Sequence, residues 1–217
     1  MESSKKKLIQ EIFLCNNRFV EEKTEEFFKD HALSQNPQIT LITCSDSRVQ
    51  TEIFTKEAVN KIFVIRNIGN QIENNLGSVD FGVLNLKTPV LLILGHTDCG
   101  AIKTFLSGYK NEKQSIRYEL DHLQIPLKNI SKNDNVLKAI EENVNWQVEI
   151  AVKRYQTSIE KKELTVIGGI YDFSNKYNKG FGRIIVININ GKRELGNINK
   201  IQELKGLPEE ILEKITV

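Results

Sequence analysis

Apolar residues are arranged in two different ways along the chain, and the difference separates predicted strands from predicted helices. Five short runs rich in β-branched residues predict strands, at 39–43, 62–65, 90–94, 164–167 and 184–187. The first four runs are nearly continuously apolar, which is typical of strands buried on both faces of a parallel sheet. The stretches between the runs predict helices, at roughly 51–59, 77–87, 101–108 and 136–155. Strands that alternate with helices predict the α/β class, with a mainly parallel sheet flanked by helices.

The segments that remain complete the predicted fold. Residues 171–182, before the last strand, leave no room for a crossover helix. That strand is therefore predicted to run antiparallel at an edge of the sheet, beside about four parallel strands. Residues 109–135 are polar and irregular, and we expect them to form an irregular segment that lies on one face of the domain. Residues 209–214 predict a short C-terminal helix.

The N-terminal part of the chain has a pattern of its own. Four apolar residues recur there at helical spacing: Leu8, Ile9, Ile12 and Phe13. Helical structure is predicted over residues 5–30. We expect residues 1–34 to form a helical arm on one domain that spans residues 1–217.

Composition narrows the classes of function. The chain has 217 residues, with 30 Lys and Arg against 28 Asp and Glu, and this even balance does not favour nucleic acid as a partner. The longest apolar run, 89–94, is far shorter than the ~20 residues that cross a bilayer, and no secretory signal is apparent. Three cysteines are an odd number and do not make a disulfide framework. We therefore expect a cytoplasmic protein with no membrane partner.

Unusual residue clusters directly follow four of the predicted strands. They occupy residues 44–48, 66–70, 95–100 and 168–169. Ligands of open α/β sheets bind outside the carboxyl ends of the strands. The sequence therefore predicts that the functional site lies on this one rim of the sheet.

Two thiols and one imidazole on that rim form a candidate metal site. Cys44 follows the first strand, and His96 and Cys99 follow the third. Three protein ligands leave one tetrahedral position open, as in catalytic zinc sites, and thiolates favour zinc over magnesium or calcium. The alternative is that both cysteines are ordinary buried residues and that His96 is a satisfied polar residue at a helix start.

An acidic and a basic residue stand beside Cys44. Asp46 and Arg48 are two positions apart, so both side chains point the same way if the segment is extended. A carboxylate paired with a guanidinium stays ionised, because the cation lowers its pKa. Such a carboxylate can accept a hydrogen bond and orient a nucleophile at the metal. The alternative is a plain structural salt bridge.

Together these motifs resemble those of the β-class carbonic anhydrases. Cys-Ser-Asp-Ser-Arg at 44–48, followed about fifty residues later by His-x-x-Cys-Gly at 96–100, is similar to the family signature. Three further segments resemble segments of the family: Asn17-Arg-Phe19, Arg66-Asn-Ile-Gly-Asn70 and Gly168-Gly-Ile-Tyr-Asp172. The resemblance runs from about residue 8 to residue 190.

The resemblance implies a zinc-dependent lyase that interconverts carbon dioxide and bicarbonate. The zinc ligands, for one ion per chain, would be Cys44, His96 and Cys99. Asp46 and Arg48 would be the catalytic dyad, in which Asp46 either stays on Arg48 or turns to the zinc as a fourth ligand.

The resemblance also implies a substrate pocket and an assembly. Gln35, contributed by a partner subunit, Phe63 and Phe81 would line a narrow pocket for a small molecule. Phe81 stands where many members of the family have a tyrosine. The protein would be a homodimer or a larger homo-oligomer, with the arm 1–34 packed on the partner.

Two other functions remain open on this sequence. The same metal residues could serve a hydrolase of carbon disulfide or carbonyl sulfide, which would differ in the shape of its access path. The scaffold could also be a non-catalytic, zinc-binding regulatory protein. The Asp46 and Arg48 pair argues against the second, because a closed structural site needs no orienting dyad.

Overall fold

The computed structural model describes residues 2–131, 134–193, 195 and 201–216. The chain divides into two compact units, Met1–Asn36 and Pro37–Val217, and each is described by itself. The unit boundary falls close to residue 34, where the predicted arm ends. That the whole chain forms one domain stays a prediction.

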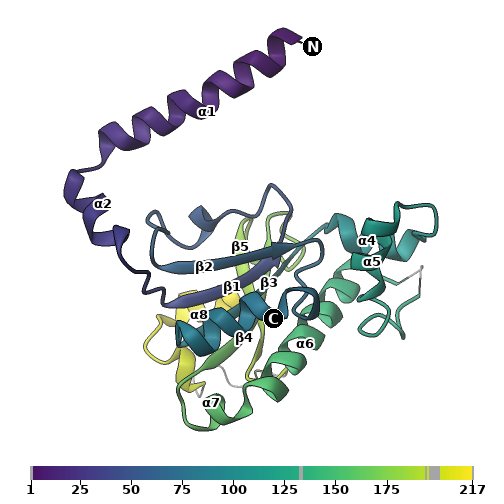
Figure 1. The fold of residues 1–217 in the computed structure, drawn as a ribbon. Helices are drawn as coiled ribbons and strands as arrows, with labels where there is room; N and C mark the ends of the chain where they lie inside the picture. Colours follow the sequence, from purple (N-terminus) through teal and green to yellow (C-terminus); the bar gives the residue numbers. More distant parts are fainter. Residues whose placement is uncertain (1, 132–133, 194, 196–200, 217) are drawn as a thin grey trace. The chain divides into compact units, whose positions relative to one another are not determined.

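The N-terminal unit consists of two helices (Figure 1). Helix α1 spans Glu2–Glu22 and helix α2 spans Glu25–Ala32, which confirms the helical pattern predicted over 5–30. The break between them follows from the sequence, because the Thr24 side chain accepts a hydrogen bond from the Phe27 amide (3.2 Å) and caps α2. Apolar side chains along α1 remain exposed, Ile12 to 65% and Phe13 to 68%.

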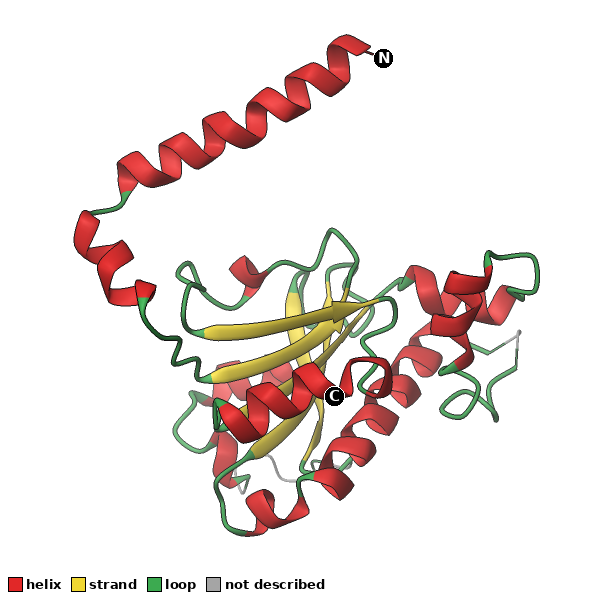
Figure 2. Ribbon diagram, viewed as in Figure 1, coloured by secondary structure: helices red, strands yellow, loops and turns green. Residues whose placement is uncertain are grey.

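The second unit is built on a five-stranded sheet (Figure 2). Its strands, in the spatial order β2-β1-β3-β4-β5, are Ile62–Asn67, Ile39–Cys44, Val90–His96, Thr165–Asp172 and Arg183–Ile189. Neighbours among β1 to β4 pair in parallel, and β5 pairs antiparallel with β4 at the edge. The predicted fold class and the antiparallel edge strand are confirmed.

Two of the strands continue beyond their apolar runs to include candidate metal ligands. β1 ends at Cys44, opposite Asn67 of β2, and β3 ends at His96, opposite Tyr171 of β4. Backbone pairing does not require apolar side chains, so the hydrophobic pattern alone ended these strands too early. The extension fixes both ligands on the rigid sheet rather than on a loop.

Helix α6, Val136–Arg154, covers one face of the sheet (Figure 1). It buries Val144 and Val148 completely, as its periodicity predicts. Two glycines in the strands allow its close approach: a Cβ at Gly95 would lie 2.7 Å from Val144 and one at Gly168 would lie 2.8 Å from Val148. The prediction of a helix over 136–155 is confirmed.

The other described helices and helical turns connect the strands and the C-terminus. They are η1 (Thr51–Ile53), η2 (Glu73–Asn75), α3 (Leu76–Asp80), η3 (Phe81–Asn85), α4 (Gly100–Ser107), α5 (Gln114–Asp121), α7 (Gln156–Glu160), η5 (Gln202–Leu204) and α8 (Glu209–Ile215). The elements α3 with η3, α4 and α8 confirm three predicted helices. On β5, Leu204 and Leu212 from the C-terminal segment pack against Val186. None of the helices in the described part of the chain combines the length and apolar character that a membrane crossing requires.

Two predictions of local structure were wrong. The helix predicted over 51–59 is only the short turn η1, because the Thr55 hydroxyl accepts a hydrogen bond from the Glu57 amide (3.2 Å) and competes with helical bonding. The segment 109–135 is not irregular throughout, because it contains α5. Only Leu120 of α5 is buried, so its apolar stripe was too narrow to be recognised.

Candidate metal centre

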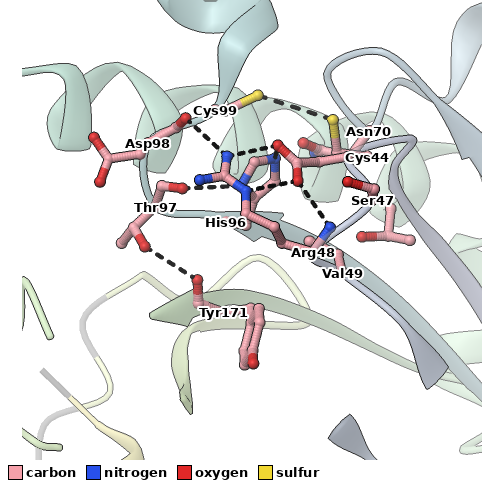
Figure 3. Close-up of polar contacts among 12 residues, drawn as sticks. Cys44, Ser47, Arg48, Val49, Asn70, His96, Thr97, Asp98, Cys99 and Tyr171 are labelled. Atoms are coloured by element: carbon pink, nitrogen blue, oxygen red, sulfur yellow. Dashed lines mark hydrogen bonds and ion pairs between the residues drawn. The ribbon is translucent and has the colours of Figure 1, made fainter. Parts of the chain in front are cut away.

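Cys44, His96 and Cys99 lie together at the carboxyl ends of the neighbouring strands β1 and β3 (Figure 3). Their candidate ligand atoms are all within 4.8 Å of one another, and all three residues are buried. Cys99 precedes α4, and the chain reaches it through Asp98, whose φ of 57° makes a tight left-handed turn. Asp is among the residues that tolerate this conformation. The predicted grouping of the three residues is therefore present in the structure.

The two thiols form a coupled pair. Their Sγ atoms are 4.0 Å apart, and Cys44 and Cys99 are 4% and 1% exposed. The hydrogen bond with the Cys99 thiol lowers the pKa of Cys44 to about 4, and His96 and the Gly69 amide act in the same direction against the effect of burial. The same hydrogen bond, with burial, raises the pKa of Cys99. A metal ion bound by both sulfurs would displace the thiol protons.

His96 presents one ring nitrogen to the thiols. Its Nδ1 lies 2.9 Å from the carbonyl oxygen of Thr97, and because a carbonyl only accepts, Nδ1 carries the proton. In the neutral ring the lone pair is then on Nε2, which is buried and has no hydrogen-bond partner among the residues that the structure describes. A histidine fixed in this way by a backbone carbonyl is the usual arrangement of a metal ligand.

These residues fit a zinc ion. Two thiolates on a tetrahedral zinc lie about 3.8 Å apart, given bonds of about 2.3 Å, and the observed separation of Cys44 and Cys99 is 4.0 Å. The unpartnered Nε2 of His96 supplies a third ligand atom. Two soft sulfurs and one imidazole are a donor set that favours zinc over hard cations.

Asp46 and Arg48 form a two-pronged ion pair beside the cluster. Arg48 donates from Nε to Oδ1 of Asp46 (2.8 Å) and from Nη2 to Oδ2 (2.7 Å), and its backbone amide also donates to Oδ1 (3.0 Å). These bonds hold the pKa of Asp46 well below its usual range and raise the pKa of Arg48. Oδ2 of Asp46 lies 3.7 Å from Nε2 of His96, so the ionised carboxylate borders the cluster.

Arg66 holds the loop that carries this pair, a role that the sequence did not reveal. Its guanidinium donates to the backbone carbonyls of Cys44 (3.0 and 3.2 Å), Asp46 (2.9 Å) and Val49. It therefore ties the end of β2 to the loop after β1. The signal available in the sequence was its position in the cluster 66–70 after a strand.

The structure does not bring Phe63, one of the predicted pocket residues, to the metal cluster of its own chain. Phe63 and Phe81 pack against each other, with ring centroids 6.0 Å apart. Phe63 lies opposite Thr40, and Thr40 is four positions along the strand from Cys44, a distance of about 13 Å. Gln35 is exposed in the N-terminal unit. The role of these three residues stays a prediction.

Comparison with known proteins identifies the family. The sequence model of the family described as carbonic anhydrase matches residues 39–177. The chain belongs to the carbonic anhydrase family. It is 31% identical over 190 residues to a carbonic anhydrase of Candida albicans, an alignment that covers 76% of this chain and 65% of that protein.

Solved β-carbonic anhydrases share its fold. The Coccomyxa enzyme in complex with acetazolamide superposes with a TM-score of 0.65 at 26% identity, covering 74% of this chain and 80% of that one. A structure from Sordaria macrospora, titled as one of two tetrameric β-carbonic anhydrases, gives a TM-score of 0.73 at 24% identity over 84% and 98% of the two chains. The chain spans less than two thirds of the length of the curated relatives that it matches.

Proposed function

We propose that this chain catalyses the zinc-dependent, reversible hydration of carbon dioxide to bicarbonate and a proton. The observation that carries the proposal is the buried cluster of Cys44, His96 and Cys99 with the ion pair of Asp46 and Arg48 beside it. Membership of the carbonic anhydrase family supports the same activity.

Each residue of the cluster has a defined part in this proposal. Cys44, His96 and Cys99 would hold one zinc ion per chain. When bound, zinc supplies a water-derived nucleophile near neutral pH, since it lowers the pKa of its water to about 7. Asp46, ionised and therefore only an acceptor, would accept a hydrogen bond from a group at the open position of the site and orient it. Arg48 keeps the Asp46 carboxylate in place through its two parallel hydrogen bonds.

The proposed substrate pocket requires a second copy of the chain. Phe63 lies opposite Thr40, about 13 Å along the strand from Cys44 of its own chain, and Phe81 packs on Phe63, so both would line the pocket of a partner. Phe81 is 44% exposed, as a residue awaiting such a contact would be. We infer a homodimer or a larger homo-oligomer, in which Gln35 and the helical arm also contact the partner.

The proposal places the protein in a reducing, cytoplasmic compartment. All three cysteines of the chain are free, and zinc binding requires Cys44 and Cys99 as thiolates rather than as a disulfide. Localisation of a tagged chain in its native cell, with thiol labelling after rapid lysis, tests this inference. A disulfide between Cys44 and Cys99 in freshly lysed cells would contradict it.

Substrate assays on the purified zinc-loaded protein test the proposed reaction. We expect rapid hydration of carbon dioxide in a stopped-flow indicator assay, and hydrolysis of carbonyl sulfide or carbon disulfide that is slower by orders of magnitude. Faster hydrolysis of either sulfur compound would favour the hydrolase. No turnover of any of the three by protein with one zinc per chain would favour a regulatory, zinc-binding role.

A further inference from the structure

We propose that Phe173 is a positioning residue that holds Arg48 against Asp46, and that the loop 173–182 serves to place its ring. This inference rests on the proposed function, because it concerns the same ion pair. It assigns a role to a segment whose sequence pattern predicted none.

The ring of Phe173 contacts two functional side chains. The Cζ atom of Arg48 lies 4.3 Å from the ring centroid, within range of a cation–π interaction. The imidazole of His96 stacks on the same ring, with centroids 5.8 Å apart and planes inclined by 27°. Phe173 therefore contacts both the cation of the ion pair and one candidate metal ligand.

Arg48 needs such a contact because its side chain is 50% exposed. Water and salt compete with an exposed ion pair, which contributes little by itself. Besides its hydrogen bonds to Asp46, the guanidinium donates a hydrogen bond only to the Asp98 carbonyl among the described residues, at 3.5 Å. Phe173 covers a face of the guanidinium, which excludes water there and restricts the orientation of the side chain.

The loop that carries Phe173 is fixed at both ends. The buried Asp172 carboxylate accepts hydrogen bonds from the amides of Lys176 and Tyr177, both at 2.9 Å. The Asp172 carbonyl accepts one from the Gly182 amide (2.8 Å), which closes the loop where β4 turns into β5. The Tyr177 hydroxyl donates to Glu141 of α6 (2.5 Å). These bonds leave Phe173 little freedom to move away from Arg48.

The Asp46 carboxylate can bind either Arg48 or a metal ion at the cluster. Its Oδ2 is 2.7 Å from Nη2 of Arg48 and 3.7 Å from Nε2 of His96, so a metal ion at the cluster would compete with Arg48 for the carboxylate. Loosening Arg48 would allow Asp46 to become a fourth ligand and to block the open position. By holding Arg48, Phe173 keeps that position open.

A double-mutant cycle with an anion probe tests this role. The probe is thiocyanate, which is titrated into the Co²⁺-substituted full-length protein and followed by visible absorption. We expect Phe173→Leu and Phe173→Met to bind thiocyanate roughly fivefold more weakly and to lose a similar factor in kcat, the size expected for one cation–π contact. Phe173→Tyr retains the ring and should behave as wild type. The matched control is Phe181→Leu, at a phenylalanine of the same loop that is 76% exposed.

The Asp46→Asn background separates positioning from a merely structural effect. Without the Asp46 carboxylate to compete, Phe173→Leu should no longer weaken thiocyanate binding. The inference is overturned if Phe173→Leu binds thiocyanate as wild type does, or if its defect persists in the Asp46→Asn background. Circular dichroism shows whether each variant is folded. Because Met and Leu differ in volume and flexibility, one of the two variants still tests the inference if the other misfolds.

The outcomes also distinguish this inference from the proposed function. Suppose that the protein hydrates no carbon dioxide, but Phe173→Leu weakens thiocyanate binding in the wild-type background and not in the Asp46→Asn background. This result would refute the proposed function and support the positioning role. A protein that hydrates carbon dioxide but lacks this pattern of thiocyanate binding would support the function and refute the positioning role. A protein that binds no Co²⁺ would contradict both.

Discussion

The two halves of the proposed active site differ in how much of each one chain supplies. The metal half is complete in a single chain: Cys44, His96 and Cys99 are buried together, and the ion pair of Asp46 and Arg48 borders them. The pocket half is not, because Phe63 lies opposite Thr40 rather than at the end of β1, and Phe81, which packs on Phe63, is 44% exposed. We therefore propose that metal binding is a property of the single chain, whereas turnover requires a second copy of it.

The largest expected effect is on the metal half. Cys44→Ser should lose the metal, and carbon dioxide hydration should fall to the uncatalysed background, because serine is a poor zinc ligand. Metal content by mass spectrometry and stopped-flow assays measure both. Cys15→Ser is the matched control, since Cys15 is exposed on α1 and should affect neither. Full activity of Cys44→Ser would remove Cys44 from the site.

A smaller effect is expected for Asp46→Asn, which should keep one zinc per chain. Carbon dioxide hydration should fall by roughly 10²-fold or more, because an amide can present a donor where an acceptor is needed. The zinc content and the rate must be measured on the same sample. Loss of zinc would show that Asp46 is a ligand, and an unchanged rate would show that the ion pair is only structural.

Mixed oligomers sharpen the comparison between the two halves. Phe81→Ala should lower kcat/KM roughly tenfold by loosening the substrate position while zinc stays bound. Co-refolding this variant with Cys44→Ser should recover activity, because the Cys44→Ser chain supplies an intact Phe81 to the metal site of the other chain. If mixing gives no more than the sum of the separate variants, the pocket does not cross between copies.

The smallest expected effect is on the free energy of unfolding, through the ion pair of Asp80 and Arg154 that links the proposed pocket residues to α6. Asp80, the residue before Phe81, accepts hydrogen bonds from Arg154 of α6 and from Tyr155, and these lower its pKa. The ionised carboxylate therefore stabilises the fold above its ordinary pKa of about 4, and this stability is lost as the pH falls through the lowered folded-state value.

Asp80→Asn should consequently lower the free energy of unfolding by at most about 1 kcal/mol at pH 7, since the pair is partly exposed. The difference from wild type should shrink as the pH falls through the lowered folded-state pKa of Asp80, as measured by urea unfolding across pH. Glu57→Gln, in the exposed pair with Lys61, is the control and should change little. A difference that persists unchanged in acid would contradict the assignment to the carboxylate.

The sequence predicted what periodicity and strand ends determine. The continuous apolar runs predicted the four parallel strands, and a helical apolar stripe predicted α6. Because ligands of open α/β sheets bind at the carboxyl ends of the strands, the sequence also predicted that Cys44, His96 and Cys99 lie together. The same pattern did not place Phe63, because its distance from the cluster depends on the register between β1 and β2.

Contacts made by loops had no sequence signal. Phe173 contacts Arg48 from a loop whose backbone amides are held by the Asp172 carboxylate. Arg66 stands in the predicted cluster 66–70, but its contacts with the loop after β1 are made to backbone carbonyls, which the pattern of side chains does not reveal. The apolar face of α1 predicted a helix and a contact surface, but not what covers it.

Removal and return of the metal tests the central claim most directly. The purified protein is stripped with a chelator, and zinc is added back in steps while carbon dioxide hydration and bound zinc are measured together. We predict that the stripped protein is inactive and that the rate rises in proportion to bound zinc, up to one ion per chain. Undiminished hydration by the stripped protein, or none by the fully loaded protein, would contradict the account.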